Sequence, residues 1–77
     1  MNGLVEHRYW QLRDGKWAAQ FHLRIYVGAT EHSTQFFDSQ RDLRYATAEE
    51  AKNRNRYLAT NWRDANMPDL ELFESRN

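Results

Sequence analysis

The sequence predicts an α+β domain: a three- or four-stranded antiparallel sheet with one helix packed on one face. Two patterns lead to this fold class. Residues 17–27 alternate strictly between apolar and polar side chains, which indicates a strand with one buried face. Residues 48–66 place small and apolar side chains on one stripe of a helical wheel, directly after an N-capping sequence. A run of strands followed by one helix is typical of the α+β class.

A hairpin that spans residues 4–27 forms the first part of the predicted sheet. The dipeptide Asp14-Gly15 precedes the alternating segment and is typical of a two-residue hairpin turn. In a tight turn Arg13 pairs with Lys16, and this pairing fixes the register of both strands. The register then places apolar residues of both strands on one inner face, as the opposed pairs Leu12 and Trp17, Trp10 and Ala19, and Leu4 and Ile25.

The predicted core lies between the inner face of the hairpin and the helix. Two charged residues, Glu6 and Arg8, also fall on this face, so we expect them at the edge of the core or beside a bulge. Aromatic side chains supply much of the buried area that a chain of 77 residues needs. The core that we expect consists of Trp10, Leu12, Trp17, Phe21, Leu23, Ile25, Leu58 and Trp62.

The helix is expected from residue 48 to about residue 66. Thr47, with Glu50 three residues later, fits a capping box, in which the two side chains bind backbone N–H groups at the start of the helix. Pro68 marks the end of the helix. Asn55 interrupts the apolar stripe. Because buried amides need hydrogen-bond partners, we expect Asn55 to bond to sheet backbone or to a loop.

Two shorter segments complete the predicted sheet. Residues 28–33 are expected to form a connecting loop, and residues 34–38, with two adjacent phenylalanines, a third strand. Residues 69–74 alternate weakly between polar and apolar side chains. This last segment is either a fourth, edge strand or a frayed tail.

The composition fits one small domain that covers residues 1–77. The 11 basic and 11 acidic residues cancel, which argues against strong non-specific binding to nucleic acid. The chain has no Cys, which excludes disulfides, thiolate nucleophiles and Cys-ligated zinc. No apolar run approaches the ~20 residues of a membrane span, and the N-terminus lacks the features of a signal peptide. We therefore expect a cytoplasmic protein that does not bind membranes.

Enzymatic and metal chemistry find little support in the sequence. No serine lies in a nucleophile motif, and no glycine-rich segment could cradle a phosphate. The predicted register places His7 across from His22 on the outer face, but a stable zinc site usually takes three or four protein ligands. We therefore predict no catalytic residue, no cofactor and no metal site.

The outer face of the hairpin is the candidate binding surface. In the predicted register it carries basic and aromatic residues and no acidic one. Rings that stack on bases, beside cations that meet phosphates, are what single-stranded nucleic acid requires. A protein-binding surface and an ordinary solvated sheet face are the alternatives. The candidate residues are Tyr9, Arg13, Lys16, Arg24 and Tyr26. A second basic stripe, on the helix, consists of Lys52, Arg56 and Arg63.

Parts of the sequence resemble known proteins. The run Phe36-Phe37-Asp38-Ser39, followed by Tyr45-Ala46-Thr47-Ala48-Glu49-Glu50-Ala51 and by Trp62, looks like a recurrent pattern in small bacterial proteins of unknown function. The order of strands and helix also resembles the AP2-like N-terminal domains of phage-type integrases, which lay a three-stranded sheet on DNA. This second resemblance implies a sheet face that binds DNA.

Together these observations favour a small non-enzymatic accessory or interaction domain, whose partner is another protein or a second copy of the chain. The alternative is a weak nucleic-acid-binding domain that uses the outer face of the hairpin. The two functions differ in their salt dependence, because binding to phosphates weakens steeply as salt increases.

Overall fold

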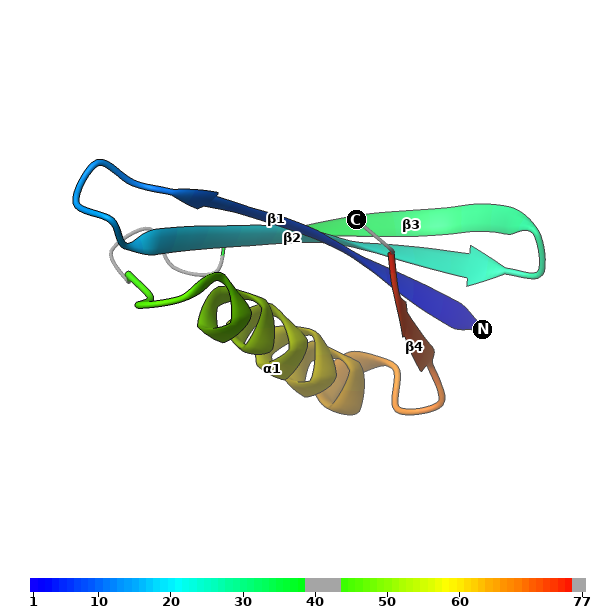
Figure 1. The fold of residues 1–77 in the computed structure, drawn as a ribbon. Helices are drawn as coiled ribbons and strands as arrows, with labels where there is room; N and C mark the ends of the chain where they lie inside the picture. Colours follow the sequence, from blue (N-terminus) through cyan, green and yellow to red (C-terminus); the bar gives the residue numbers. More distant parts are fainter. Residues whose placement is uncertain (39–43, 76–77) are drawn as a thin grey trace.

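The chain forms a four-stranded sheet with one helix across one face (Figure 1). The structure is a computed structural model, and it describes residues 1–38 and 44–75. Along the chain the elements are β1 (Asn2–Gln11), β2 (Trp17–Val27), β3 (Thr30–Asp38), α1 (Ala48–Asn66) and β4 (Glu71–Glu74). The strand order is β3-β2-β1-β4; β1 and β3 run antiparallel to β2, whereas β4 runs parallel to β1. The predicted α+β class is confirmed, with one parallel pair in an otherwise antiparallel sheet.

The loop between β1 and β2 is one residue longer than predicted. The Leu12 N–H donates to the Lys16 carbonyl at 2.7 Å, and the Gly15 N–H donates to the Leu12 carbonyl at 3.0 Å. Residues 13–15 therefore form a three-residue loop, a type that typically ends with a residue in the left-handed conformation. Gly15 takes this position with a φ of 85°.

This longer loop exchanges the two faces of β1 relative to the predicted register. Side chains alternate along a strand, so a shift of one residue moves each of them to the opposite face of the sheet. Val5 and His7, which were predicted outside, lie on the inner face opposite Leu23 and Phe21. His7 is therefore not the cross-strand neighbour of His22.

Five residues predicted on the inner face lie elsewhere for the same reason. Leu4, Glu6, Arg8 and Trp10 are on the outer face of β1, where Leu4 is opposite Arg24 rather than Ile25, and Trp10 is 42% exposed. Leu12 lies directly before the loop and is only half-buried, outside the core cluster. The prediction that Trp10 and Leu12 belong to the core is wrong.

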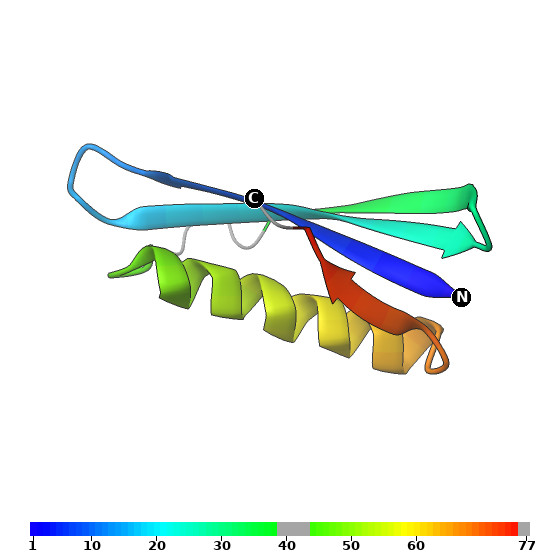
Figure 2. The same cartoon turned by 45° about the vertical axis from the view of Figure 1, so that its right-hand side comes forward.

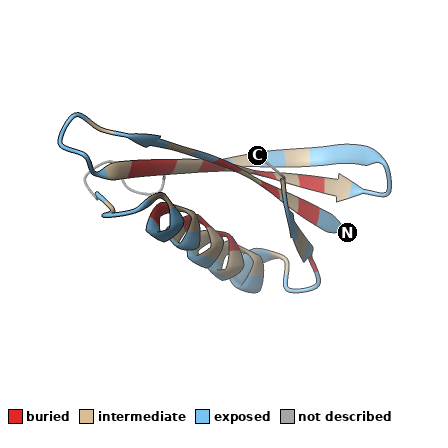
Figure 3. Cartoon of the chain, in the orientation of Figure 1, coloured by how far each residue is buried: buried red, intermediate tan, exposed pale blue. Residues whose placement is uncertain are grey.

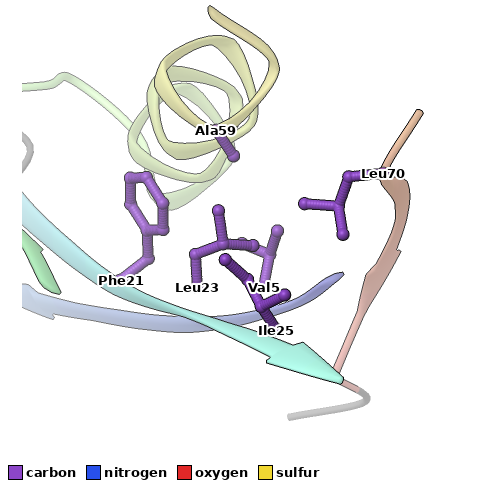
Figure 4. Packing of buried hydrophobic residues seen from close by; sticks show 6 residues of the cluster. All are labelled: Val5, Phe21, Leu23, Ile25, Ala59 and Leu70. Atoms are coloured by element: carbon purple, nitrogen blue, oxygen red, sulfur yellow. The ribbon is translucent and has the colours of Figure 1, made fainter. Parts of the chain in front are cut away.

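The core lies between the inner face of the sheet and α1, with the segment before β4 at one end (Figures 3 and 4). Its fully buried members are Val5, Phe21, Leu23, Ile25, Ala59 and Leu70. Partly buried residues that pack against them are Phe37, Leu58, Trp62, Met67 and Leu72. Among the predicted core residues, Phe21, Leu23 and Ile25 are confirmed as fully buried, while Leu58 and Trp62 lie at the margin. Trp17 is half-buried on the inner side of β2.

β3 begins earlier than predicted, because Gly28 and Ala29 form a tight two-residue turn. Val27 pairs with Thr30 across this turn, and Gly28 has a φ of 62°. A positive φ at the first position is what the favoured hairpin turns require. The predicted loop over residues 28–33 is therefore wrong beyond its first two residues.

The C-terminal segment is a strand rather than a frayed tail. β4 pairs in parallel with Asn2–Val5 of β1. Gly3 permits this close approach: a Cβ at Gly3 would lie 2.9 Å from Leu70 Cδ2 and 3.0 Å from Leu72 Cδ2. Any side chain at this position would displace the leucines that hold β4 against β1.

Both ends of α1 lie where the sequence predicts them. Thr47 is the N-cap, and its Oγ1 accepts from the Glu50 N–H at 3.1 Å. The Glu50 carboxylate accepts from the Ala46 N–H at 3.0 Å, one residue before the backbone group that a capping box usually binds. In the described part of the chain, no helix combines the length and the apolar composition needed to cross a membrane.

Candidate functional site

The residues predicted to form a binding face do not all share that face. Tyr9 lies on the inner side of β1, where its ring centroid is 6.1 Å from that of Trp17. The Nζ of Lys52, in α1, lies 5.7 Å from the centroid of the Tyr9 ring. The prediction that Tyr9 lies on the outer face is wrong, and its ring packs beside the helix.

Arg24 and Tyr26 lie on the outer face as predicted, but this face does carry acidic residues. Arg24 forms ion pairs with Glu6 and with Glu31, whose Oε1 lies 3.2 Å from an Arg24 guanidinium nitrogen. A hydrogen bond from Thr34, together with the charge of Arg24, lowers the pKa of the Glu31 carboxyl. Two carboxylates therefore neutralise Arg24 before any ligand arrives.

Unpaired positive charge gathers instead at the end of the first hairpin. Arg8, Arg13 and Lys16 are exposed and form no ion pair with any residue of the described ranges. The one acidic residue of the loop, Asp14, accepts from the Lys16 N–H at 2.9 Å. Trp10 lies beside these cations on the outer side of β1. We call Arg8, Trp10, Arg13 and Lys16 the hairpin-end surface.

The rest of the outer sheet face presents separate aromatic rings rather than free cations. Phe36 of β3 is 55% exposed and Phe73 of β4 is 49% exposed. The His22 ring meets Phe36 edge-on, with 5.1 Å between ring centroids. The helix lies on the opposite side of the sheet and leaves this face open (Figure 2). It is an uncovered, mixed polar and aromatic surface.

One edge of β1 is covered by β4 over only part of its length. β4 pairs with Asn2–Val5, and no described strand pairs with the edge from His7 to Gln11. A surface hollow of about 490 Å³, lined by residues 7–10, lies in this part of β1. The open stretch of edge is therefore adjacent to the hairpin-end surface.

A polar cluster joins both strands of the hairpin to α1 and β4. The Asn55 Nδ2 donates to His7 Nδ1 and to the Gln20 carbonyl, both at 3.0 Å. The His7 Nε2 lies 3.2 Å from Glu74 Oε1, which also accepts from Arg56. Because an amide nitrogen donates, this network assigns the His7 proton to Nε2. The expected bond from Asn55 to sheet backbone is confirmed.

The inner part of this cluster, His7 and Asn55, is structural, because both side chains are buried. The His7 side chain is 1% exposed, and its burial lowers the pKa of the imidazole, so the ring is neutral near neutral pH. Hydrogen bonds from Arg56, which has the larger effect, and from His7 lower the pKa of the Glu74 carboxyl. The sequence signal for the cluster was Asn55 in the apolar stripe. Its partner His7 was missed because the predicted register placed His7 outside.

The pair of histidines considered as a metal site from the sequence is not assembled. His7 and His22 lie on opposite faces of the sheet. Within the described residues, no group of three or more His, Cys, Asp or Glu side chains could hold a metal ion.

The basic stripe of the helix is also occupied. Lys52 lies over the Tyr9 ring, and Arg56 is held by the Glu74 carboxylate. Arg63 contacts Asp64 at 3.0 Å. Arg56 and Arg63 therefore have anionic partners within the fold, unlike the cations of the hairpin-end surface, whereas Lys52 contacts a ring and forms no ion pair with a described residue.

Comparisons of the chain with protein-family models, with curated proteins and with solved structures give no match.

Proposed function

We propose that this chain is a non-enzymatic interaction domain that binds an acidic segment of a partner protein at the hairpin-end surface. One observation carries the proposal. The three cations of this surface are exposed and have no ion-pair partner in the described chain, whereas Arg24, Arg56 and Arg63 each contact a carboxylate. Trp10 lies among the free cations, and exposed tryptophan and arginine are enriched at the centres of protein interfaces.

The state of each cation decides what it can offer to a ligand. An arginine already held by carboxylates, such as Arg24, must exchange one anionic partner for another, so binding through it gains little. Arg8, Arg13 and Lys16 have no such partner to give up. An anionic partner therefore gains most at the end of the hairpin.

Titration of the full chain with a fluorescent peptide of alternating Glu and Val tests the proposal. Arg8→Gln and Lys16→Gln should each weaken binding by a small factor, since an exposed charge pair contributes roughly 0.2–1 kcal/mol. The double variant should weaken it several-fold. Arg63→Gln removes the same charge from α1 and should bind like the parent chain. Equal binding by Arg8→Gln, Lys16→Gln and Arg63→Gln would contradict the proposal.

A weak nucleic-acid-binding domain is the second candidate. It is favoured by the same free cations and by the Trp10 ring, on which a base could stack. Glu6 and Glu31 lie on the same sheet face beside Arg24 and oppose a polyphosphate and an acidic peptide alike, so the ligands are distinguished by experiment. A labelled oligothymidine in the same titration distinguishes the two candidates. Oligothymidine binding that falls steeply with salt, with no binding of the acidic peptide, would favour the second one.

A further inference from the structure

We infer that the edge of β1 from His7 to Gln11 takes up the acidic partner as an additional β-strand. The inference rests on the proposed function and adds to it the mode of binding. An unpaired strand edge presents a row of N–H and C=O groups, and extended peptides are commonly recognised by pairing with such a row. The ligand is then an extended acidic segment rather than a helix or a folded surface.

The main-chain groups of alternate β1 residues point to this edge. Leu12 bonds to β2 through its N–H, so even-numbered residues of β1 face β2 and odd-numbered residues face the other edge. The Ser75 N–H, which donates to the Val5 carbonyl at 3.0 Å, agrees with this alternation. The same alternation directs the N–H and C=O groups of Tyr9 and Gln11 to the edge, where no described strand pairs with them.

The charges beside the edge favour acidic side chains on either face of an added strand, so a peptide of alternating Glu and Val, which carries its carboxylates on one face, can meet a cation in either orientation. Successive side chains of such a strand point to opposite faces of the sheet. On the outer face they approach Arg8. On the inner face they approach Lys52, which reaches over the Tyr9 ring. Neither cation forms an ion pair with a described residue, so each can receive a carboxylate of the ligand.

The opposite edge of the sheet does not offer the same match. β3 is the edge strand there, and its sequence contains no lysine or arginine. Its Glu31 already binds Arg24 and Thr34 and would repel an acidic strand. The distribution of charge therefore selects β1 over β3.

Two substitutions at one position test strand addition. Gln11→Pro removes an N–H from the open edge, and the ladder between β1 and β2 does not use this group. Gln11→Ala keeps the N–H and is the matched control. For the peptide of alternating Glu and Val, Gln11→Ala should bind like the parent chain. Gln11→Pro should bind roughly fivefold more weakly or worse, as expected for one lost hydrogen bond.

Amide hydrogen exchange of the unsubstituted chain provides a measurement that does not depend on how a variant folds. Addition of the peptide should slow exchange at the Tyr9 and Gln11 amides, because these acquire partners. Exchange at the Arg8 and Trp10 amides should change much less, because these already face β2.

The outcomes separate the inference from the proposed function. Peptide binding that depends on Arg8 and Lys16, but leaves Gln11→Pro and the Tyr9 and Gln11 amides unaffected, would overturn strand addition alone. No binding of the peptide by the parent chain would remove the proposed function as well. Protection of these amides without peptide, rising with protein concentration, would identify a second copy as the occupant and overturn the acidic ligand.

Discussion

The two halves of β1 have very different surroundings. From Asn2 to Val5 the strand is covered by β4 along its edge and by the core on its inner face, and Val5 is 2% exposed. Near Gln11 the strand has no described partner on that edge, and Trp10 is 42% exposed. The cause is length, since β4 has 4 residues and β1 has 10. The same strand thus supplies part of the core in one half and an unpaired edge in the other.

The polar groups near β1 also differ between its covered and its open half. Where β1 meets α1 and β4, the buried groups of His7 and Asn55 bond to one another, because an unpaired buried polar group is costly. At the hairpin end, solvent satisfies the cations, and the fold imposes no partner on them. The cations available to a ligand are therefore the ones that the fold does not need. This makes function testable there without unfolding the chain.

Removal of core volume should give the largest difference between the covered and the open half of β1. Leu23 of β2 is completely buried and lies opposite Val5, in the covered half, so Leu23→Ala should lower the free energy of unfolding by about 2–5 kcal/mol. Trp10→Ala, in the open half, should cost much less despite the larger side chain. Urea unfolding of both variants measures this. A greater loss for Trp10→Ala would restore the originally predicted register.

Loss of the buried amide should have the next largest effect. Asn55→Ala leaves the Gln20 carbonyl and His7 Nδ1 without the donor that they share, and should lower stability by roughly 1–3 kcal/mol. Asn61→Ala, on the exposed side of the same helix, is the control and should stay close to the parent. Coincident urea midpoints for the two variants would mean that the Asn55 hydrogen bonds contribute nothing to stability.

The N-cap of α1, which lies away from both halves of β1, should contribute a smaller amount to the free energy of unfolding. Thr47→Ala removes the oxygen that accepts from the Glu50 N–H, and should cost about 1 kcal/mol. Thr47→Ser keeps the hydroxyl and should restore most of the loss. Thermal or urea unfolding of the pair distinguishes the lost cap from a lost methyl group.

The smallest effect we expect is an acid destabilisation that arises at His7. Burial, partly opposed by Glu74, lowers the pKa of the folded-state imidazole below its ordinary value of 6.5. As the pH falls below that value, the unfolded chain binds more protons than the folded chain, so the free energy of unfolding decreases. Glu74, with its own lowered pKa, adds to this decrease at more acidic pH. His7→Gln should lower stability overall and flatten the decrease below pH 6.5; an unchanged slope would assign it to another group.

The parts of the fold that the sequence predicts correctly are those with local signals. The capping box at Thr47 and the proline at Pro68 mark the ends of α1, and strict alternation marks β2. The register of β1 has no equivalent signal. Asp14-Gly15 serves in a two-residue turn and equally in the three-residue loop found here. Since apolar and polar residues occur on both faces of β1, its own sequence does not discriminate.

The candidate site was predictable to the same extent. Arg13 and Lys16 lie in the turn or directly beside it in either register, so their exposure follows from the turn signal alone. The position of Tyr9 depends on the register and was wrong. The neutralisation of Arg24 by Glu6 requires that Glu6 lie on the outer face, which the shorter turn had excluded. The open edge of β1 depends on where β4 stops, and weak alternation over residues 69–74 left even the existence of that strand open.

The parallel pairing of β1 with β4 also bears on the order of folding. It joins segments near the two ends of the described chain, so it carries the largest loop-closure entropy of any pairing in the sheet. We expect the hairpins and the helix to form first and β4 to dock last. Leu72→Ala should then accelerate unfolding and leave the folding rate almost unchanged; a comparable slowing of folding would place β4 in the transition state. Until β4 docks, the whole edge of β1 is open, and a newly made chain is most exposed to pairing with its neighbours at that stage.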